Sequence, residues 1–64
     1  MKLVYALMHN TGIDHFEISG LYATLELAMA AVPIDWKKQE GLAIWEGWHP
    51  DGGLWCIEVH PLID

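Results

Sequence analysis

The chain has 64 residues, which is enough for a single domain spanning residues 1–64, and 53% of these residues are hydrophobic. Nine acidic residues against three lysines give a formal net charge of −6, which disfavours direct binding to nucleic acid or anionic membranes and favours a basic protein partner. The single cysteine excludes an intramolecular disulfide and fits a reducing environment.

Two features of the sequence bear on location. The apolar run 3–8 near the start is closed by His9 and lacks the pattern of a secretory signal. The longest apolar stretch, 21–32, contains Thr24 and Glu26 and is shorter than the roughly 20 residues that span a bilayer. The sequence therefore predicts a cytoplasmic protein with no membrane partner.

Two strands are expected at the beginning of the chain. Residues 2–9 are rich in β-formers and almost continuously apolar, which predicts a strand followed by a polar turn cluster at 10–14. Residues 15–22 alternate in character, which predicts a half-buried second strand antiparallel to the first, with a bulge or close backbone approach at Gly20. One expected face of this strand holds Phe16, Ile18 and Tyr22, and the other holds Glu17, Ser19 and Leu21.

A helix is expected between Ala23 and Val32. Thr24 is a suitable N-cap, Glu26 lies in the first turn, and Pro33 ends the run. The expected core stripe consists of Leu25, Ala28, Ala31 and Val32. Leu27 and Met29 then lie on the outer side, where a second contact, such as a dimer contact, would cover them.

The end of the chain predicts a hairpin. Residues 34–41, which contain Lys37 and Lys38, read as a solvated connection, and residues 42–60 read as two strands around the turn sequence HPDGG. A tight turn at Asp51 and Gly52 pairs Trp48 with Trp55, Glu46 with Ile57, Trp45 with Glu58, and Gly47 with Cys56. The expected core face then holds Ile44, Trp48, Trp55, Ile57 and Val59. Glu46 is a misfit on that face, which either a bulge near Gly47 or an edge position that lets the carboxylate reach water would relieve.

These elements predict an α+β fold, with a four-stranded antiparallel sheet and one helix on one face, in the order β-β-α-β-β. A single helix covers only one face of a sheet. The uncovered face is expected to carry Trp45, Glu58, Cys56, His60, Glu17, Ser19, Val4, Ala6 and Met8. Because aromatic residues and Met are enriched at protein interfaces, this face is the predicted binding surface.

Metal, cofactor and catalytic chemistry are not expected. Cys56 and His60 are four residues apart on a strand, roughly 13 Å, and cannot chelate one ion. His9, His15 and Asp14 could converge near a turn, but a set of three such residues in a loop is a weak metal signal. A thiol enzyme built on Cys56 stays an alternative, although a free Cys is usually a small buried hydrophobe. The tryptophans could stack bases, but no basic groove accompanies them.

Several carboxylates are expected around the sheet and its loops, and Trp45 is a candidate anchor for a partner. The carboxylates are Asp14, Glu17, Glu46, Asp51 and Glu58. Together with the negative net charge, they predict salt-sensitive binding to a basic partner.

The sequence also resembles small proteins encoded by bacteriophages and mobile elements. The likeness consists of the Val4–Tyr5 pair, the Gly20–Tyr22 step into the helix, the Ala-rich stretch 28–32, and WCIEV at 55–59. It covers most of the chain, although related helices carry Glu on the outer side where this chain has Leu27 and Met29.

The resemblance implies no enzyme activity and points to a phage accessory protein in a bacterial host, similar to small acidic anti-defence proteins that include anti-CRISPR proteins. By this analogy the chain is expected to inhibit a bacterial protein by occupying its basic nucleic-acid-binding surface. The alternative is a homodimeric structural or accessory protein without an inhibitory role, pairing through Leu27, Met29 and the uncovered sheet face.

Overall fold

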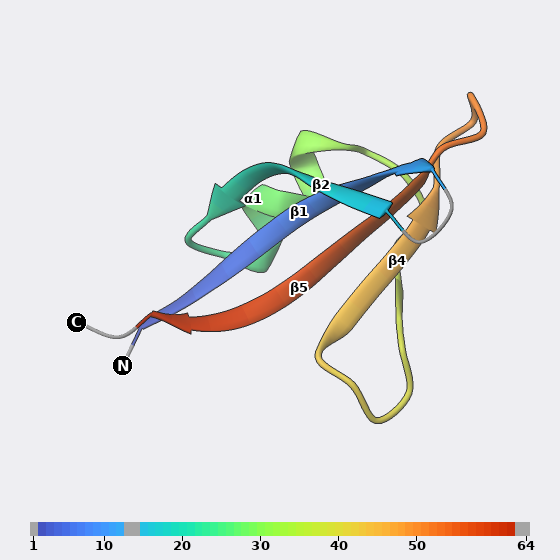
Figure 1. Cartoon of the computed structure of the whole chain (residues 1–64). Coiled ribbons are helices and arrows are strands. Elements are labelled where there is room, and N and C mark those ends of the chain that lie inside the picture. Colours follow the sequence, from blue (N-terminus) through green and yellow to red (C-terminus); the bar gives the residue numbers. More distant parts are fainter. Residues whose placement is uncertain (1, 13–14, 63–64) are drawn as a thin grey trace.

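The computed structural model describes residues 2–12 and 15–62. Within them the elements are β1 (Lys2–Gly12), β2 (His15–Tyr22), α1 (Leu25–Ala31), β3 (Lys37–Lys38), β4 (Ile44–Trp48) and β5 (Leu54–Leu62), as shown in Figure 1. The strands form one antiparallel sheet in the order β2-β1-β5-β4-β3. The predicted α+β class is confirmed, but the sheet has five strands rather than four.

The additional strand is β3, in the stretch predicted to be a solvated connection. Lys37 pairs with Glu46 and Lys38 pairs with Trp45, so this strand forms the edge of the sheet beside β4. A strand of two exposed lysines has no hydrophobic alternation from which a sequence pattern could identify it.

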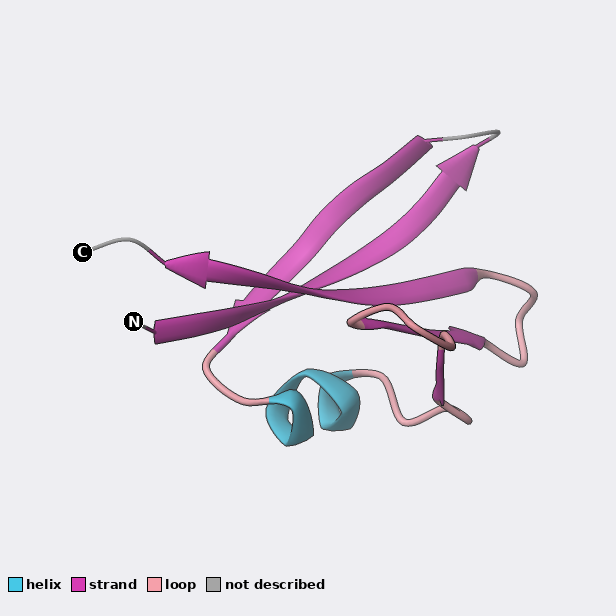
Figure 2. Cartoon of the chain, turned by 90° about the horizontal axis from the view of Figure 1, so that it is seen from below, coloured by secondary structure: helices cyan, strands magenta, loops and turns pink. Residues whose placement is uncertain are grey.

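The core lies between α1 and one face of the sheet. Its buried residues are Leu7 of β1, Ala28 and Val32 at the helix, and Ile57 of β5. Half-buried side chains surround them, namely Tyr5, Tyr22, Leu25, Met29, Ile34, Trp36, Trp45 and Trp55. Figure 2 shows α1 on one side of the strands and no helix on the other side. The predicted one-sided cover of the sheet is therefore confirmed for the described residues.

The helix begins where the sequence predicts, but one of its four predicted core residues differs. The Leu27 N–H donates to Thr24 Oγ1 at 3.2 Å, which confirms Thr24 as the N-cap. Leu25, Ala28 and Val32 face the core as predicted, but Ala31 is exposed and Met29 packs against the core instead. These four core positions follow the i, i+3, i+4, i+7 spacing of one helical face. Met29 is thus a core residue, and only Leu27 of the predicted dimer pair projects outward, 55% exposed.

Replacing Thr24 with Ala is expected to lower the free energy of unfolding by about 1 kcal/mol, because the Leu27 N–H loses its acceptor. Urea unfolding followed by circular dichroism measures the change. Thr24→Ser keeps the hydroxyl and serves as the matched control. Equal midpoints for the Ala and Ser variants would show that the cap contributes nothing to stability.

The turn between β4 and β5 is one residue longer than predicted. The His49 N–H donates to the Gly53 carbonyl at 2.7 Å, and the Gly52 N–H donates to the His49 carbonyl at 2.8 Å. Gly52 has φ of 97°, which glycine adopts without steric cost. This is the pattern of a three-residue loop at 50–52, with Pro50 in the position after the first turn residue that its fixed φ favours.

The longer loop shifts the register of β4 by one residue. Trp45 lies opposite Ile57, Glu46 opposite Cys56, and Trp48 opposite Leu54. Because side chains alternate along a strand, a shift by one residue moves every side chain of β4 to the opposite face. The predicted placement of Trp45 on the uncovered face and of Trp48 and Ile44 in the core is therefore wrong. The predicted bulge near Gly47 is also wrong, since the register runs without interruption from Ile44 to Trp48.

A bulge does occur in β2, next to the predicted position. Leu7 pairs with Gly20 and Met8 pairs with Ile18, so Ser19 has no counterpart in β1. The extra residue places Leu21, rather than Tyr22, on the same face as Ile18. Glu17 pairs with His9 on the helix-covered side, which corrects its predicted place on the uncovered face.

Candidate functional site

The side of the sheet opposite α1, called here the open face, is assigned from the pairing of the strands. Its apolar members are Val4, Ala6, Met8, Phe16, Ile18, Leu21, Ile44, Trp48, Leu54 and Cys56, and its polar members are Asn10, Lys37, Glu46, Glu58 and His60. The predicted positions of Val4, Ala6, Met8, Cys56, Glu58 and His60 on this face are confirmed. All five strands contribute side chains to it.

Large apolar side chains project from the open face into solvent. Trp48 is 67% exposed, Ile18 64%, Leu21 61% and Phe16 38%. Phe16, Ile18 and Leu21 all belong to β2 and form an apolar row that we call the β2 strip. Trp48 lies at the far end of β4, on the other side of β1 and β5. Exposed apolar area gathered on one face of a small domain is typical of a surface that binds another molecule.

Two small side chains at the centre of the open face are buried by the side chains around them. Ala6 is 2% exposed and Cys56 7%, although no helix covers them. Burial, together with the nearby carboxylates Glu58 and Glu46, raises the pKa of the Cys56 thiol from 9.0 to about 11. The thiol is consequently protonated at neutral pH, and the thiolate that a nucleophilic cysteine needs is scarce.

Cys56 is expected to react with a thiol reagent at pH 8 far more slowly in the folded chain than in urea, because it is buried and protonated.

The raised pKa of the Cys56 thiol also makes the free energy of unfolding depend on pH. The contribution of the neutral thiol is complete below the unfolded pKa near 9 and is lost as the pH rises through about 11. Colorimetric thiol titration and urea unfolding at pH 8 and pH 11 measure the two effects, and Cys56→Ala should reduce the loss of stability between these two pH values.

Two of the predicted carboxylates, Glu46 and Glu58, lie on the open face. Glu46 is opposite Cys56 on β5 and Lys37 on β3, and Glu58 is opposite Ala6 on β1. The Glu58 Oε1 lies 3.8 Å from the His60 Nε2, within ion-pair distance when the imidazole is protonated. The open face therefore combines half-buried carboxylates on β4 and β5 with exposed apolar side chains on β2 and at the end of β4.

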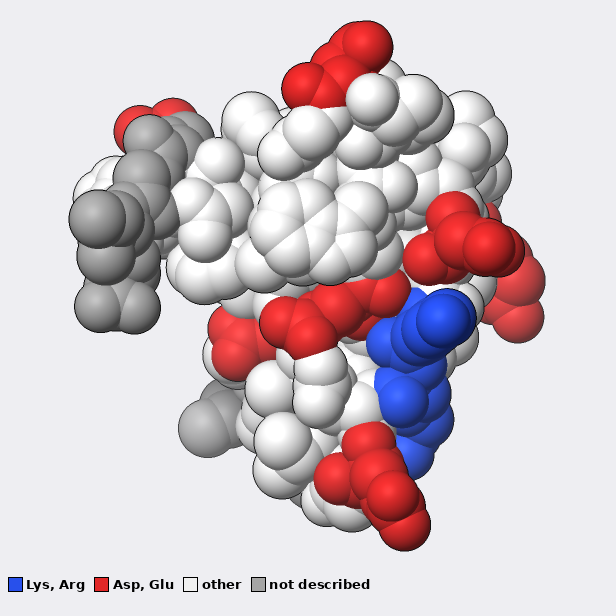
Figure 3. All heavy atoms as spheres, turned by 90° about the vertical axis from the view of Figure 1, so that its right-hand side faces the viewer, with Lys and Arg blue, Asp and Glu red and all other residues white. Residues whose placement is uncertain are grey.

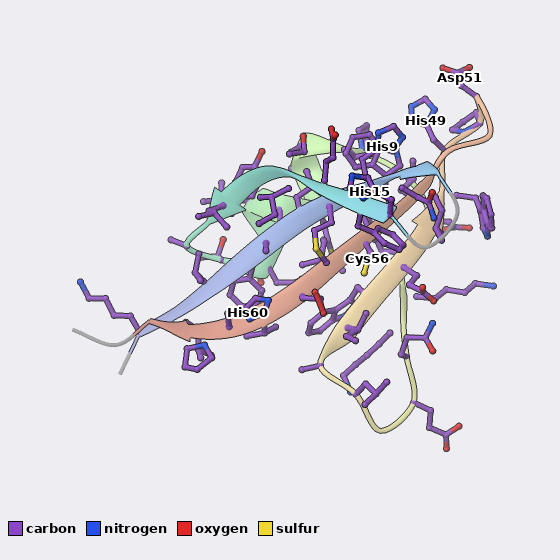
Figure 4. All side chains as sticks on the ribbon, in the orientation of Figure 1. His9, His15, His49, Asp51, Cys56 and His60 are labelled. Carbon is purple, nitrogen blue, oxygen red and sulfur yellow. The ribbon has the colours of Figure 1, made fainter. Side chains whose placement is uncertain are left out.

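The other predicted site residues lie elsewhere. Trp45 packs against the core, and Glu17 lies on the helix-covered side, where its Oε1 is 3.9 Å from the His15 Nε2. Asp51 is at the tip of the β4–β5 loop, with its Oδ2 3.4 Å from the His49 Nδ1, and Figure 4 shows both residues at that tip, away from Cys56. Asp14 is outside the described residues, so its predicted role stays a prediction.

A pocket of about 450 Å³ adjoins the open face between β3 and β4. It is lined by Asp35, Lys37, Lys38, Gln39, Glu40, Glu46, Gly47, Trp48 and Leu54. Figure 3 shows lysine side chains gathered in one stripe of this side of the molecule, with acidic groups next to them. Because charges of both signs alternate around the pocket, it does not present a basic groove to a nucleic acid.

Among residues 2–12 and 15–62, no three His, Cys, Asp or Glu side chains come together as metal ligands would. His9 stacks on Trp55, with ring centroids 4.3 Å apart and an interplanar angle of 17°, so its ring is held by packing.

The described residues, 2–12 and 15–62, contain no helix with the length and apolar character needed to cross a bilayer. No family model, curated protein or solved structure matches the chain.

Proposed function

We propose that the chain is a protein-binding module that docks on a basic partner through its open face. The observation that carries the proposal is the exposure of Trp48, Ile18 and Leu21, each more than 60%, on the one sheet face that the helix leaves uncovered. Trp side chains are enriched among residues that dominate the energy of protein interfaces. The corrected register thus makes Trp48 the proposed aromatic anchor in place of Trp45.

Charge supports a basic partner. The chain has a net charge of −6, and Glu46 and Glu58 lie on the same open face as the exposed apolar side chains. Complementary charges around an interface raise the association rate and discriminate against wrong partners more than they add affinity. Association should therefore slow with increasing salt, while the apolar contacts retain part of the affinity.

The more specific form of the proposal is an inhibitor of the phage anti-defence type, acting in the cytoplasm of a bacterial host. In this form, the open face occupies a basic surface of a bacterial protein that otherwise binds nucleic acid. The ratio of nine acidic to three basic residues supports it, because a compact acidic domain competes electrostatically for a site that binds phosphates. The resemblance to phage-encoded proteins supports the bacterial setting.

The test begins with affinity capture from bacterial lysates and mass spectrometry, followed by calorimetry with each purified partner. The variant Glu46→Lys/Glu58→Lys should weaken binding by at least about tenfold, since charge reversal at an interface is strongly unfavourable. Glu26→Lys/Asp51→Lys changes the net charge equally, on α1 and at the tip of the β4–β5 loop, and should retain most of the affinity. Trp48→Ala should weaken binding while leaving the fold intact.

A competition experiment with nucleic acid distinguishes the inhibitor proposal from the more general proposal of a protein-binding module. If the partner's own DNA or RNA displaces the chain, both forms are supported. If nucleic acid and the chain bind together, the inhibitory form is wrong and the binding module stands. Equal affinities for the two double-charge variants would contradict docking through the open face itself.

A further inference from the structure

The pocket beside β4 has an apolar wall that includes the proposed aromatic anchor. Trp48 and Leu54 lie opposite each other on β4 and β5, and both line this pocket of about 450 Å³. Trp48 is 67% exposed, so its indole ring is accessible to another molecule. The volume falls within the roughly 300–1,000 Å³ of pockets that bind small molecules, and it is too small for a folded element of a partner. The pocket is therefore suited to receive a side chain.

The least exposed charge at this pocket is negative. Glu46 is half-buried, whereas Lys37 and Lys38 are exposed at the edge of the sheet. Asp35 and Glu40 are also exposed and bring the lining to three carboxylates against two lysines. Figure 3 shows acidic side chains along the hollow beside the lysine stripe. Because a partly buried charge is less screened by water than an exposed one, the pocket favours a cation over an anion.

Among the described residues, Glu46 has no cationic partner. Lys37 is opposite Glu46 on β3, but the ammonium and the carboxylate do not come within ion-pair distance. The carboxylates that do lie within this distance of a cationic group are Glu17, Asp51 and Glu58, each beside a histidine. A half-buried carboxylate without a counter-charge is free to accept hydrogen bonds from a cation that a ligand supplies.

An aromatic ring beside a carboxylate is the combination that an arginine side chain complements. Glu46 and Trp48 are two residues apart on one face of β4, so their Cα atoms are about 7 Å apart. The guanidinium group is planar, stacks on aromatic rings, and donates two parallel hydrogen bonds to a carboxylate. We infer that the pocket binds an arginine side chain of the basic partner, stacked on Trp48 and hydrogen-bonded to Glu46, an assignment that rests on the proposed function.

The lysines distinguish a cation site from an anion site. Lys37 lies on the open face opposite Glu46, so its positive charge opposes a cation bound there. Lys37→Gln should therefore strengthen the binding of an arginine derivative about twofold. A nucleotide with its base on Trp48 and its phosphate at the lysines is the alternative occupant, and the same variant would weaken its binding.

Titration of the whole chain with N-acetyl-arginine methylamide, followed by nuclear magnetic resonance, is the test. The indole N–H signal of Trp48, assigned with the Trp48→Phe variant, should shift with a dissociation constant in the millimolar range, because one side chain binds weakly. The signals of Trp36, Trp45 and Trp55 should shift less. The citrulline derivative has nearly the same shape without the charge and should bind at least about tenfold more weakly. The lysine derivative should also bind more weakly, since an ammonium does not stack.

Two variants remove the proposed contacts one at a time. Glu46→Gln should weaken arginine binding at least about fivefold, because it removes the charge-assisted hydrogen bonds. Trp48→Ala should weaken it by a similar factor, because it removes the stacking surface. Glu58→Gln is the matched control, the same substitution at another half-buried carboxylate of the open face that does not line the pocket, and should leave the affinity unchanged. Circular dichroism will verify that each variant folds.

The outcomes for the pocket and for the proposed function are separate. Equal binding of the arginine and citrulline derivatives would overturn the arginine site, and so would weaker arginine binding by Lys37→Gln. A shift of the Trp48 signal by adenosine monophosphate but not by the arginine derivative would identify an anion site instead. If a captured partner binds through Trp48 while the arginine derivative does not, docking through the open face stands and the arginine site is wrong. If the arginine derivative binds but no partner responds to the open-face variants, the proposed function is wrong and the arginine site stands.

Discussion

Replacement of Ile57 with Ala is expected to remove most of the folding stability of this chain. Ile57 is fully buried, lies opposite Leu7 on β1 and Trp45 on β4, and belongs to the core cluster with Ala28. Removing an Ile side chain from such a site costs about 2–5 kcal/mol, from lost apolar burial and from the cavity left behind. A chain of this size has roughly 3–10 kcal/mol of stability in total, at typical values per residue.

Thermal and urea unfolding of the variant, followed by circular dichroism, measure this loss. The matched control is Ile18→Ala, the same substitution at a position that is 64% exposed, which should cost less than about 1 kcal/mol. Both variants should be compared at low micromolar concentration, so that association does not contribute. If Ile57→Ala and Ile18→Ala were equally stable, the core could not lie between the helix and β5.

The size of this effect follows from how little the chain can bury. Only six hydrophobic residues of the described part are buried, and the fully buried large side chains among them are Leu7 and Ile57. These two lie opposite each other on the central strands β1 and β5. The apolar residues left over cannot enter so small a core, and several of them project from the open face and α1.

The register of the last hairpin shows where the sequence was informative and where it was not. The turn residues HPDGG located the hairpin correctly, but they are compatible with a loop of two or three residues. Pro50 lacks an N–H and favours a turn position, so the three-residue loop is the better physical reading of this sequence. The choice decides whether Trp45 or Trp48 faces solvent, because one residue of shift exchanges the faces of β4.

Local signals predicted the positions of the elements better than their faces. The Thr24 cap, the limits of β2 and a bulge near Gly20 were evident from residue types. The hydrophobic pattern could not place Leu21, since the extra residue at Ser19 reverses the alternation after it. A core stripe that includes Ala31 leaves Met29 on the surface, whereas in the structure the long Met29 side chain packs against the core and Ala31 is exposed.

The sequence predicted the uncovered sheet face and its β5 residues correctly, but it placed the β4 residues on the wrong faces. One helix against a sheet requires an uncovered face, and Glu58 and Cys56 were placed there correctly because β5 keeps its predicted faces. Glu46 was assigned to the core face as a misfit, and the true register removes the conflict by turning it outward. A charged side chain on a predicted core face was therefore the signal in the sequence that the register was off by one residue.

Gly47 makes the second prediction with a large effect. It lies in the middle of β4, opposite Trp55, on the helix-covered face. A Cβ at this position would meet the Asp35 carbonyl oxygen at 2.8 Å and the Ile34 Cδ1 at 2.7 Å, both closer than van der Waals contact allows. The Ile34 side chain can rotate away, but the Asp35 oxygen belongs to the backbone. Gly47→Ala must therefore displace the connection between α1 and β3, at a cost of about 1–3 kcal/mol.

Urea unfolding measures the cost, and amide hydrogen exchange locates it. Faster exchange should be confined at first to the segment after α1, which packs over Gly47, and to β3, which follows it and pairs with β4. Gly20→Ala is the matched control in another strand, where the new Cβ meets only the ring of Tyr22, at 3.0 Å, and a ring can move aside. If Gly47→Ala cost no more than Gly20→Ala, the close approach of Asp35 to β4 would be wrong. The register that turns Trp48 toward solvent would then lose one of its supports, since only that register turns Gly47 toward Asp35.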